Sequence, residues 1–568
     1  MQWKSIMAHW LNHLPPEDPL RIELQNEPNP EDCFDNSLEF GTAGIRGRLG
    51  PGTNRMNIYT VRKAAAGLAK YITDQGQDAM KCGVAIAYDC RHMSPEFALE
   101  SAKILGMYGI RSFLFKDLRP TPLLSFAVRY LRTYAGIMVT ASHNPPDYNG
   151  LKMYGPDGAQ LSLHAVDSIV NKIQTIESEF LLNPPHEKEL QQQGYITYIG
   201  HRIDNAYLDS LTTIRLNKKI QNDLRIVFTP LHGTATQLVR KAFNAAGNYN
   251  VTLVKEQMHP DPDFPTVTSP NPEECAVFEL AIQYAKEVDA DILLATDPDA
   301  DRLGVAVKNP AGEYVVLTGN QLGALMLHYL LEQKSLPHNG VIIKTIVTSE
   351  LGRAMAADFS VKTIDTLTGF KFIAEKIDEF ESTGECQFLF GYEESGGYLI
   401  GDFVRDKDAI QSVMLAAEMA SYHKQQGNSL YEVLTGLFEK YGYYQESLKS
   451  IKLEGRDGSK QIVRIMDAFR VDPPSQTIEL EDYMAGESIH VPSGLKSLID
   501  LPKSNVLKFK LSDESWFCIR PSGTEPKCKL YFAVKGKTMA ESKDKLSLLE
   551  KAVMKKVKQL IEYMAAGK

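Results

Sequence analysis

Three aspartates, Asp297, Asp299 and Asp301, stand at alternate positions directly after an apolar run that predicts a buried strand. Side chains at alternate positions of an extended segment point to the same side, so these carboxylates can converge on one hard cation. The segment does not complete a calcium loop, because Arg302 and Lys308 stand where that loop needs glycine and glutamate. Three carboxylates leave coordination positions open. This pattern suits Mg²⁺ that also contacts a phosphate oxygen.

A serine follows another apolar run. The segment Thr140–Asn144 comes directly after the predicted strand 135–139, and the chain must then turn at Pro145–Gly150. An α/β protein places nucleophiles at such strand ends, and Ser142 is the candidate. Adjacent side chains of an extended segment point opposite ways, which argues against a dyad of Ser142 with His143. On its own residues, the segment is better explained as a polar turn.

Two further segments carry arginine among glycines. Phe40–Arg48 is predicted to be a glycine-rich loop whose arginines could hold an anion, although solvated arginines explain it better when it is taken alone. Arg520–Lys527 lies between two predicted strands and offers the donors that a phosphate dianion needs. A plain hairpin loop explains that second segment equally well.

The segment Gly391–Gly397 contains Glu393 and Ser395 in a glycine-rich loop after a predicted strand. A carboxylate beside a serine suits hydrogen bonding to vicinal sugar hydroxyls. Thr368–Lys371 precedes this loop and Arg405–Asp408 follows it. Each of the three segments, taken separately, is better explained as a solvated loop.

The elements that position these residues alternate between strand and helix. Strands are predicted at 83–88, 112–115, 135–139, 224–228, 291–295, 341–346 and 387–390, with helices that include 61–72 and one capped by Ser94. This alternation predicts βαβ units with mostly parallel sheets, which bind ligands beyond the carboxyl ends of the strands. Closely spaced strands at 506–511, 516–519 and 530–534 precede a terminal helix and predict an antiparallel α+β block.

The composition is that of a globular protein of several domains: 568 residues, 43% apolar and 23% charged, with a formal net charge of −9. An acidic chain is unsuited to general nucleic-acid binding. The seven cysteines form no CxxC pair, which predicts free buried thiols in a reducing compartment. The sequence offers neither a signal peptide nor a membrane span. We therefore expect a cytoplasmic protein that binds neither nucleic acid nor membranes.

Four of these segments occur in the order found in the α-D-phosphohexomutase superfamily, with one in each of four domains. They are Thr140–Asn144, the Asp297–Asp301 loop, Glu393–Gly396 and Arg520–Thr524. The chain resembles this superfamily over essentially its whole length, and its length and the Glu-Glu-Ser and Arg-Asp-Lys-Asp contexts are most similar to the phosphoglucomutase-2-like group. The resemblance implies a heart-shaped enzyme with α/β mixed-sheet domains at 1–205, 206–320 and 321–445, and an α+β domain at 446–568.

The resemblance also implies a role for individual residues. Ser142 would be phosphorylated, with Arg46 and His143 around it and Lys152 as a candidate proton shuttle. One Mg²⁺ per subunit would be held by Ser142, Asp297, Asp299 and Asp301. The residues implied to contact the sugar phosphate are Arg302, Thr368, Gly369, Lys371, Glu393, Ser395, Arg405, Lys407, Arg520, Ser522, Gly523 and Thr524.

The activity that the resemblance implies is the interconversion of glucose 1-phosphate and glucose 6-phosphate, with glucose 1,6-bisphosphate as intermediate and activator. A phosphopentomutase acting on ribose or deoxyribose phosphates and a phosphomannomutase are the alternatives within the superfamily. Tyr392 and Gly397 depart from the usual sugar loop and bear on which sugar is preferred. A metal-dependent phosphatase and a non-catalytic sugar-phosphate sensor are alternatives from other classes. We expect a monomer or a weak homodimer.

Overall fold

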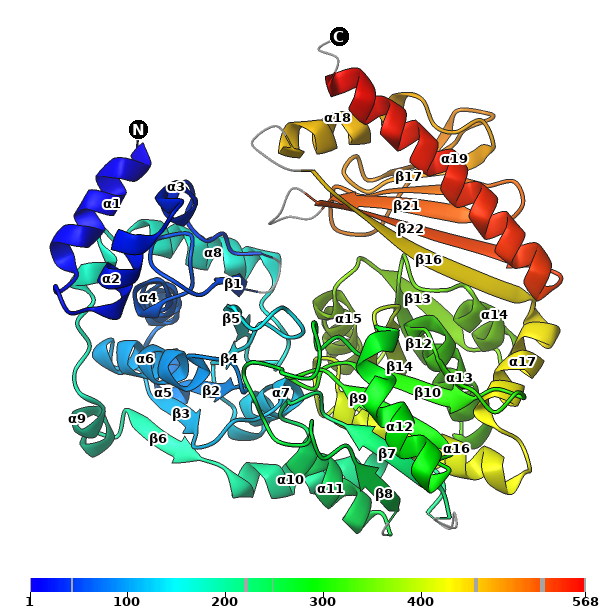
Figure 1. The fold of residues 1–568 in the computed structure, drawn as a ribbon, viewed down its shortest axis with the longest axis horizontal. Helices are drawn as coiled ribbons and strands as arrows, with labels where there is room; N and C mark the ends of the chain where they lie inside the picture. The colour runs from blue at the N-terminus through cyan, green and yellow to red at the C-terminus, as the bar shows by residue number, and fades with distance from the viewer. Residues whose placement is uncertain are drawn as a thin grey trace. The chain divides into compact units, whose positions relative to one another are not determined.

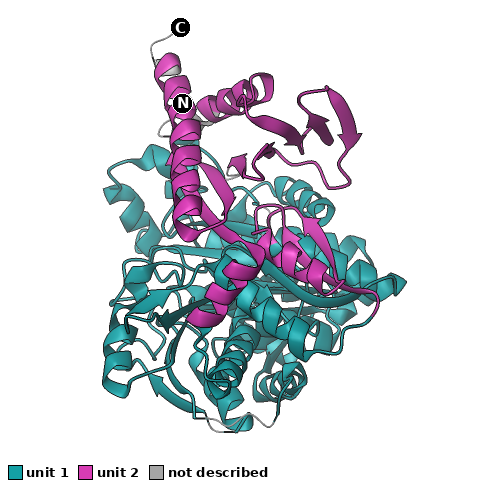
Figure 2. Cartoon of the chain, turned by 90° about the vertical axis from the view of Figure 1, so that its right-hand side faces the viewer, with its two compact units in different colours: residues 1–337, 370–430 teal, residues 338–369, 431–568 magenta. Residues whose placement is uncertain are grey.

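The computed structural model describes residues 2–41, 44–218, 223–247, 249–453, 458–521 and 527–565. They form two compact units, which Figure 2 shows in different colours. Unit 1 comprises residues 1–337 and 370–430, and unit 2 comprises residues 338–369 and 431–568. None of the helices formed by the described residues combines the length and the apolar character needed to cross a lipid bilayer.

The first sheet of unit 1 has the strand order β1-β5-β4-β2-β3-β6 (Figure 1). Its strands are β1 (Gly44–Arg48), β2 (Val84–Tyr88), β3 (Ser112–Phe115), β4 (Ala135–Val139), β5 (Tyr148–Tyr154) and β6 (Ile196–Ile199). β2, β3, β4 and β6 pair in parallel, as the alternation of strands and helices predicts. The helices of this part are α4 (Ile58–Asp74), α5 (Gln77–Cys82), α6 (Ser94–Met107), α7 (Thr121–Leu131), α8 (Leu163–Gln174) and α9 (Glu187–Gln192).

β5 and β1 add to this sheet as antiparallel strands, which corrects two expectations. The predicted turn at Pro145–Gly150 ends early, because β5 begins at Tyr148, and Arg46 lies in a strand rather than in a loop. Gly150 pairs with Arg46, and a Cβ on Gly150 would lie 2.5 Å from the carbonyl oxygen of Ile45. The glycine that suggested a turn instead allows two strands to approach closely.

The N-terminal helices α1 (Gln2–His13), α2 (Pro19–Asn26) and α3 (Pro30–Phe34) form where the sequence predicts a helical lead-in broken by prolines. Their apolar side chains gather around the fully buried Trp10. The Trp10 indole N–H donates to Glu179 Oε1 at 2.8 Å, so this small core is tied to the segment that follows α8. A buried indole N–H needs such a partner.

The second sheet of unit 1 has the order β11-β10-β9-β7-β8. Its strands are β7 (Arg225–Thr229), β8 (Asn250–Leu253), β9 (Ile292–Thr296), β10 (Leu303–Lys308) and β11 (Tyr314–Val316), and the accompanying helices are α10 (His201–Leu211), α11 (Thr236–Ala245) and α12 (Glu279–Val288). β7 pairs in parallel with β8 and β9, whereas β10 is antiparallel to both β9 and β11. Thr296 ends β9, so the aspartates begin at the carboxyl end of a buried strand.

The remainder of unit 1 is formed by α13 (Gly319–Gln333), α15 (Phe370–Thr383), β14 (Gln387–Glu393), β15 (Gly397–Leu399) and α16 (Ala409–Gln425). β14 and β15 pair antiparallel, with Glu393 opposite Gly397. Asp408 caps α16 by accepting hydrogen bonds from the N–H groups of Ile410 and Gln411 at 2.9 and 3.0 Å. The segment between β15 and α16 contains Arg405 and Lys407.

Unit 2 contains an antiparallel sheet with the order β16-β22-β21-β20-β17-β18-β19. Its strands are β16 (Tyr443–Lys452), β17 (Thr477–Asp482), β18 (Glu487–His490), β19 (Leu495–Leu498), β20 (Leu507–Leu511), β21 (Trp516–Pro521) and β22 (Lys527–Gly536). α18 (Gly458–Val471) and α19 (Met539–Ala565) pack against it around a shared apolar core. The expected α+β class of this block is confirmed. The other elements of the unit are the parallel strands β12 (Gly340–Thr345) and β13 (Lys362–Thr366), with α14 (Leu351–Asp358) and α17 (Leu430–Tyr441).

Two smaller expectations need correction. Ser94 is the first residue of α6, and the N-cap is Met93. The Ser94 hydroxyl does not cap the helix but donates to Asp89 Oδ1 at 2.7 Å. The seven cysteines are free, as expected, but they are not all buried. Cys82 and Cys275 are exposed, and Cys90 and Cys386 are partly buried.

Unit 2 also buries a cluster of charges around Glu350. Lys344 is fully buried, and its Nζ lies 3.1 Å from Glu350 Oε1. Lys508 Nζ lies 3.8 Å from the same oxygen and donates to the carbonyl of Ile346 at 2.7 Å. Burial opposes ionisation of Glu350, but the attraction of Lys344, Lys508 and Arg353 outweighs it and lowers the pKa of Glu350 from 4.5 to about 2.

Replacing Glu350 by Gln should destabilise unit 2 by about 2 kcal/mol at pH 7, because two buried ammonium groups lose the carboxylate that they share. Lys344 keeps Asp365, whose Oδ1 lies 3.1 Å from its Nζ. The folded state holds the pKa below its unfolded value, so this stability is present above pH 4.5 and is lost as the pH falls toward about 2. Hydrogen exchange of β20 and β21 at pH 7 and pH 4 measures the effect, which should shrink at the lower pH. Glu514→Gln, at an exposed position, is the control. Equal protection in E350Q and wild type would contradict the prediction.

Candidate active site

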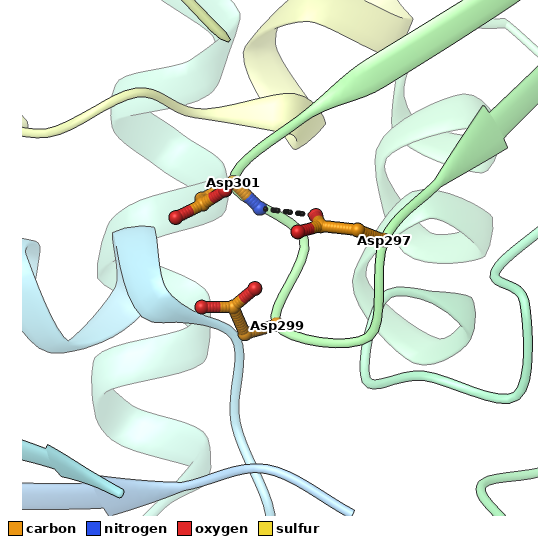
Figure 3. Close-up of side chains that lie close together, drawn as sticks. All are labelled: Asp297, Asp299 and Asp301. Carbon is orange, nitrogen blue, oxygen red and sulfur yellow. Dashed lines mark hydrogen bonds between the residues drawn. The ribbon is translucent and has the colours of Figure 1, made fainter. Parts of the chain in front are cut away.

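Asp297, Asp299 and Asp301 lie on the loop between β9 and β10, with their carboxylates turned toward one another (Figure 3). One oxygen of each lies within 4.8 Å of the others, and all three residues are buried. Asp297 Oδ1 accepts hydrogen bonds from the backbone N–H groups of Asp301 and Arg302, both at 3.0 Å. The alternate spacing in the sequence thus produces one convergent cluster, which lies entirely within unit 1.

A neighbouring loop fixes the aspartate loop in place. The segment after β7 contains Gly233, where a Cβ would lie 2.4 Å from the Cα of Pro298. Thr234 donates to the carbonyl of Pro298 from both its N–H and its hydroxyl, each at 2.9 Å. Only glycine allows this approach, because real Cβ atoms do not come so close to another backbone. The aspartate loop is therefore held in place by the chain around it.

The aspartate cluster fits a divalent cation. Among the described residues, Asp299 Oδ1 and Asp301 Oδ1 are buried and accept no hydrogen bond. Buried oxygens without a partner are costly and call for an explanation. A cation at this point would satisfy both, and a set of carboxylate oxygens suits Mg²⁺.

Ser142 lies beside the cluster, on the loop after β4. Its hydroxyl donates to Asp297 Oδ2 at 2.9 Å, and its backbone N–H donates to Thr140 Oγ1 at 2.8 Å. Ser142 Oγ also lies 3.2 Å from His143 Nδ1, so the expectation that adjacent side chains could not meet is wrong. The reason is local: Ser142 has a φ of 52°, which turns the chain out of the extended conformation assumed in that expectation.

Arg91 lies inside the serine loop and holds it, although no role for this residue was expected from the sequence. Its guanidinium donates to the carbonyl oxygens of Ser142 at 2.6 Å, Pro145 at 2.8 Å and Tyr148 at 3.1 Å, and also to that of Asn144. The side chain is fully buried. The only sequence signal was its place just after β2, at the carboxyl edge of the sheet where ligands bind. Its five donors suit a ring of carbonyls.

Two lysines approach the aspartates. Lys152 Nζ, from β5, lies 2.7 Å from Asp299 Oδ2 and 2.9 Å from Asp301 Oδ2. Lys407 Nζ lies 2.9 Å from the same oxygen of Asp301. Arg302 is more distant, with its Nε 3.9 Å from Asp301 Oδ1.

These contacts shift the pKa values of Asp297 and Asp301 in opposite directions. Burial and the neighbouring charges of Asp301 and Asp299 raise the pKa of Asp297 well above its usual range. Burial also acts on Asp301, but the attraction of Lys152, Lys407 and Arg302 outweighs it and holds the pKa of Asp301 well below its usual range. Among the described residues, the carboxylate beside the serine is therefore the one with no ion-pair partner, and Arg302 acts on it only from farther away.

Other expected site residues are found on nearby elements of unit 1. Glu393 is buried at the end of β14, and Ser395 lies in the turn before β15, where the Gly396 carbonyl accepts from the N–H of Leu303 at 2.9 Å. Lys371 is buried near the start of α15. The segment Gly391–Gly397 is thus joined directly to β10, the strand that leaves the aspartate loop.

Two expected arginines make protein contacts. Arg46 Nη1 donates to Asn144 Oδ1 at 2.9 Å, which places it over the serine loop. The buried guanidinium of Arg405 is held by Glu381 and by the carbonyl of Asp402, and its backbone N–H donates to Ser125 Oγ at 2.9 Å. Arg405 therefore ties elements of unit 1 together, and its expected contact with the substrate stays a prediction.

The remaining expected residues belong to unit 2. Thr368 and Gly369 precede α15, and Gly369 has a φ of 125°. Arg520 lies in β21, opposite Lys529 of β22. Ser522, Gly523 and Thr524 lie outside the described residues.

Comparison with known proteins extends this picture over the whole chain. Four family models match, described as the phosphoglucomutase/phosphomannomutase α/β/α domains I, II and III and C-terminal domain, at residues 37–180, 205–312, 318–441 and 457–546. A phosphoglucomutase of Staphylococcus haemolyticus is 40% identical over 509 residues, which are 89% of this chain and 91% of that protein. A phosphoglucomutase of Staphylococcus aureus is 40% identical over 518 residues, or 90% and 92%. The chain belongs to the α-D-phosphohexomutase superfamily.

Solved structures agree on the four-domain phosphohexomutase fold. The open form of a Paramecium phosphoglucomutase, parafusin, has a TM-score of 0.69 at 17% identity and covers 92% of this chain and 96% of its own. A phosphoglucomutase/phosphomannomutase family protein from Burkholderia thailandensis has a TM-score of 0.66 at 21% identity, with coverages of 91% and 97%. The expected superfamily and four-domain architecture are confirmed.

Replacing Arg91 by Lys should loosen the serine loop, because a single ammonium cannot serve four carbonyls. Each charge-assisted hydrogen bond contributes about 1.5–3 kcal/mol, so we expect a loss of about 2–4 kcal/mol of local stability. Hydrogen exchange of residues 140–150 measures it. Arg111→Lys is the matched control, since Arg111 donates to a single carbonyl, that of Lys81, at the surface. Unchanged exchange of the loop in R91K would show that Arg91 does not hold it.

Proposed function

We propose that this phosphosugar mutase is a phosphoglucomutase, which interconverts glucose 1-phosphate and glucose 6-phosphate through phosphorylated Ser142 and a glucose 1,6-bisphosphate intermediate. One observation carries the proposal: the buried Ser142 hydroxyl lies 2.9 Å from Asp297 of the aspartate cluster. An oxygen that could carry a phosphoryl group thus lies against groups that suit a cation. The relatives named phosphoglucomutase, at 40% identity, support glucose as the sugar.

In the proposed reaction, the bond from phosphorus to Ser142 Oγ breaks while a bond forms to the free hydroxyl oxygen of the sugar monophosphate. The hydroxyl proton leaves that oxygen, and Lys152 is the candidate to carry it. The resulting bisphosphate turns over, and its other phosphoryl group returns to Ser142. Mg²⁺ held by Asp297, Asp299 and Asp301 would neutralise charge on the transferring group.

The remaining roles are also proposals. Glu393 and Ser395 would hold sugar hydroxyls, and Lys371, Thr368 and Gly369 would contribute to sugar recognition. Arg520 with residues 522–524 would grip the phosphate that is not being transferred. Arg46 and His143 would surround the phosphoserine, and Arg302 and Lys407 would face the reacting phosphate. Arg405, whose guanidinium pairs with Glu381, would also contact the substrate.

Several properties of the whole molecule are proposed with the function. The domains would span residues 1–205, 206–320, 321–445 and 446–568. The enzyme would be a monomer or a weak homodimer with one Mg²⁺ per subunit, would act in the cytoplasm, and would need neither nucleic acid nor a membrane. Glucose 1,6-bisphosphate would act as its activator by phosphorylating Ser142.

Replacing Ser142 by Ala should lower glucose phosphate interconversion by roughly 10³-fold or more, because the phosphoryl carrier is lost. Turnover of glucose 1-phosphate with Mg²⁺ and a trace of glucose 1,6-bisphosphate measures this. Ser382→Ala, at an exposed position on α15, should keep wild-type turnover. Near-normal activity of S142A would refute Ser142 as the carrier.

The same assay separates the alternatives. Glucose, mannose, ribose and deoxyribose 1-phosphates are compared with and without the bisphosphate. A preference for glucose 1-phosphate that depends on the bisphosphate supports the proposal, whereas a pentose preference favours a phosphopentomutase. Release of inorganic phosphate without any need for bisphosphate would indicate a phosphatase, and no turnover of any sugar phosphate would favour a sensor.

A further inference from the structure

Lys407 reaches the aspartate cluster over a glycine. Its side chain runs from the segment before α16, and its Nζ ends 2.9 Å from Asp301 Oδ2 and 3.7 Å from Asp406 Oδ1. A Cβ on Gly397 would lie 2.4 Å from the Cδ of Lys407 and 3.3 Å from its Cβ. A separation of 2.4 Å is closer than carbon atoms approach in folded proteins, so any side chain at position 397 would displace the lysine stem.

Position 397 therefore needs glycine because a side chain there would occupy the space of the Lys407 stem. Gly397 lies in β15 opposite Glu393, and its φ is not positive. Its missing side chain leaves room for the methylene groups of Lys407. Glycine at position 397, where the sequence departs from the usual sugar loop, therefore affects the aspartate cluster through the position of the Lys407 side chain.

The two lysines hold Asp301 in different ways. Lys152 Nζ is shared between Asp299 at 2.7 Å and Asp301 at 2.9 Å, so it has two close carboxylate partners in the cluster. Lys407 has one close partner there, Asp301, and its second carboxylate, that of Asp406, lies outside the cluster. Asp406 is itself fixed by the hydroxyl of Tyr154 at 2.8 Å. Lys407 can therefore move away from Asp301 and still lie beside a carboxylate, that of Asp406.

A divalent cation would have to share Asp301 with these ammonium groups. The free oxygen of Asp301, Oδ1, belongs to the same carboxylate whose Oδ2 accepts from both lysines. Like charges a few ångströms apart repel strongly in a buried setting. A cation bound by Asp301 gains from that carboxylate but is repelled by each ammonium that stays.

We propose that Lys407 is a tethered counter-cation for Asp301, which neutralises the carboxylate in the metal-free protein and moves away when a divalent cation binds. Gly397 makes this arrangement possible. The inference rests on the proposed metal site. The flexible four-carbon stem lets the ammonium move by rotation of its own bonds, toward Asp406 or toward a phosphate oxygen. Metal binding and the position of Lys407 would then be coupled.

The test is metal affinity, measured by titration calorimetry with Mg²⁺ and with Mn²⁺ on the full-length, dephosphorylated protein without sugar phosphate. Lys407→Met removes the competing charge and should bind both ions on the order of tenfold more tightly than wild type. In the absence of metal, K407M should melt at a lower temperature than wild type, and saturating Mg²⁺ should raise its Tm more. Lys376→Met, which removes a half-buried lysine of α15 that pairs with Glu379, should match wild type in both measurements.

Two further variants keep the test decisive if K407M folds poorly without metal. Lys407→Arg retains the charge and should bind Mg²⁺ no more tightly than wild type. Gly397→Ala retains the lysine but displaces its stem, so it should bind Mg²⁺ more tightly than wild type, by less than K407M. Equal affinities in wild type, K407M and G397A would overturn the inference while leaving the metal site intact. If wild type bound neither ion, the proposed metal site itself would fail.

Discussion

The mutual repulsion of three buried carboxylates is the constraint on which the rest of unit 1 depends. Asp297, Asp299 and Asp301 lie within one small volume, where water cannot screen them. Lys152 reaches them from the antiparallel strand β5, and Lys407 from the segment before α16. The fold therefore brings three distant parts of the chain together around one set of negative charges. Removing any one of those parts would leave charge in the interior without compensation.

The serine loop and the aspartate loop each contain a residue in a strained backbone conformation that the surrounding structure enforces. Ser142 has a φ of 52° and Ala300, inside the aspartate loop, also has a φ of 52°. Non-glycine residues in this region cost of order 1 kcal/mol or more each and persist only where the structure over-determines them. Arg91 supplies that constraint for the first loop and the close contact of Gly233 with Pro298 supplies it for the second. The serine and the aspartates are thus preorganised on rigid supports, as catalysis by positioning requires.

The sequence predicted what depends on local spacing and missed what depends on contacts across the chain. The aspartate cluster followed from alternate positions after a strand, whereas Ser142 alone looked like a polar turn. Arg91 was missed because a buried arginine that binds carbonyls has the same sequence signature as a solvated one. The expectation about His143 was wrong because one left-handed residue reverses side-chain direction, and sequence does not show φ. Arg46 was placed in a loop because of the glycines around it, and the strand that pairs with it was hidden because Gly150 was interpreted as a turn residue.

The contact between Ser142 and Asp297 also explains why a phosphoserine and a cation would need each other in this site. Unmodified Ser142 donates its hydroxyl hydrogen to Asp297 Oδ2. A phosphorylated serine has no such hydrogen and would place a dianion against the buried carboxylate of Asp297. That carboxylate has no cation within ion-pair distance in the part of the chain that the structure describes. Repulsion at this distance in a buried setting amounts to several kcal/mol. A divalent cation between the two groups would turn that repulsion into attraction, so the phosphorylated enzyme would retain its metal more strongly than the unmodified one.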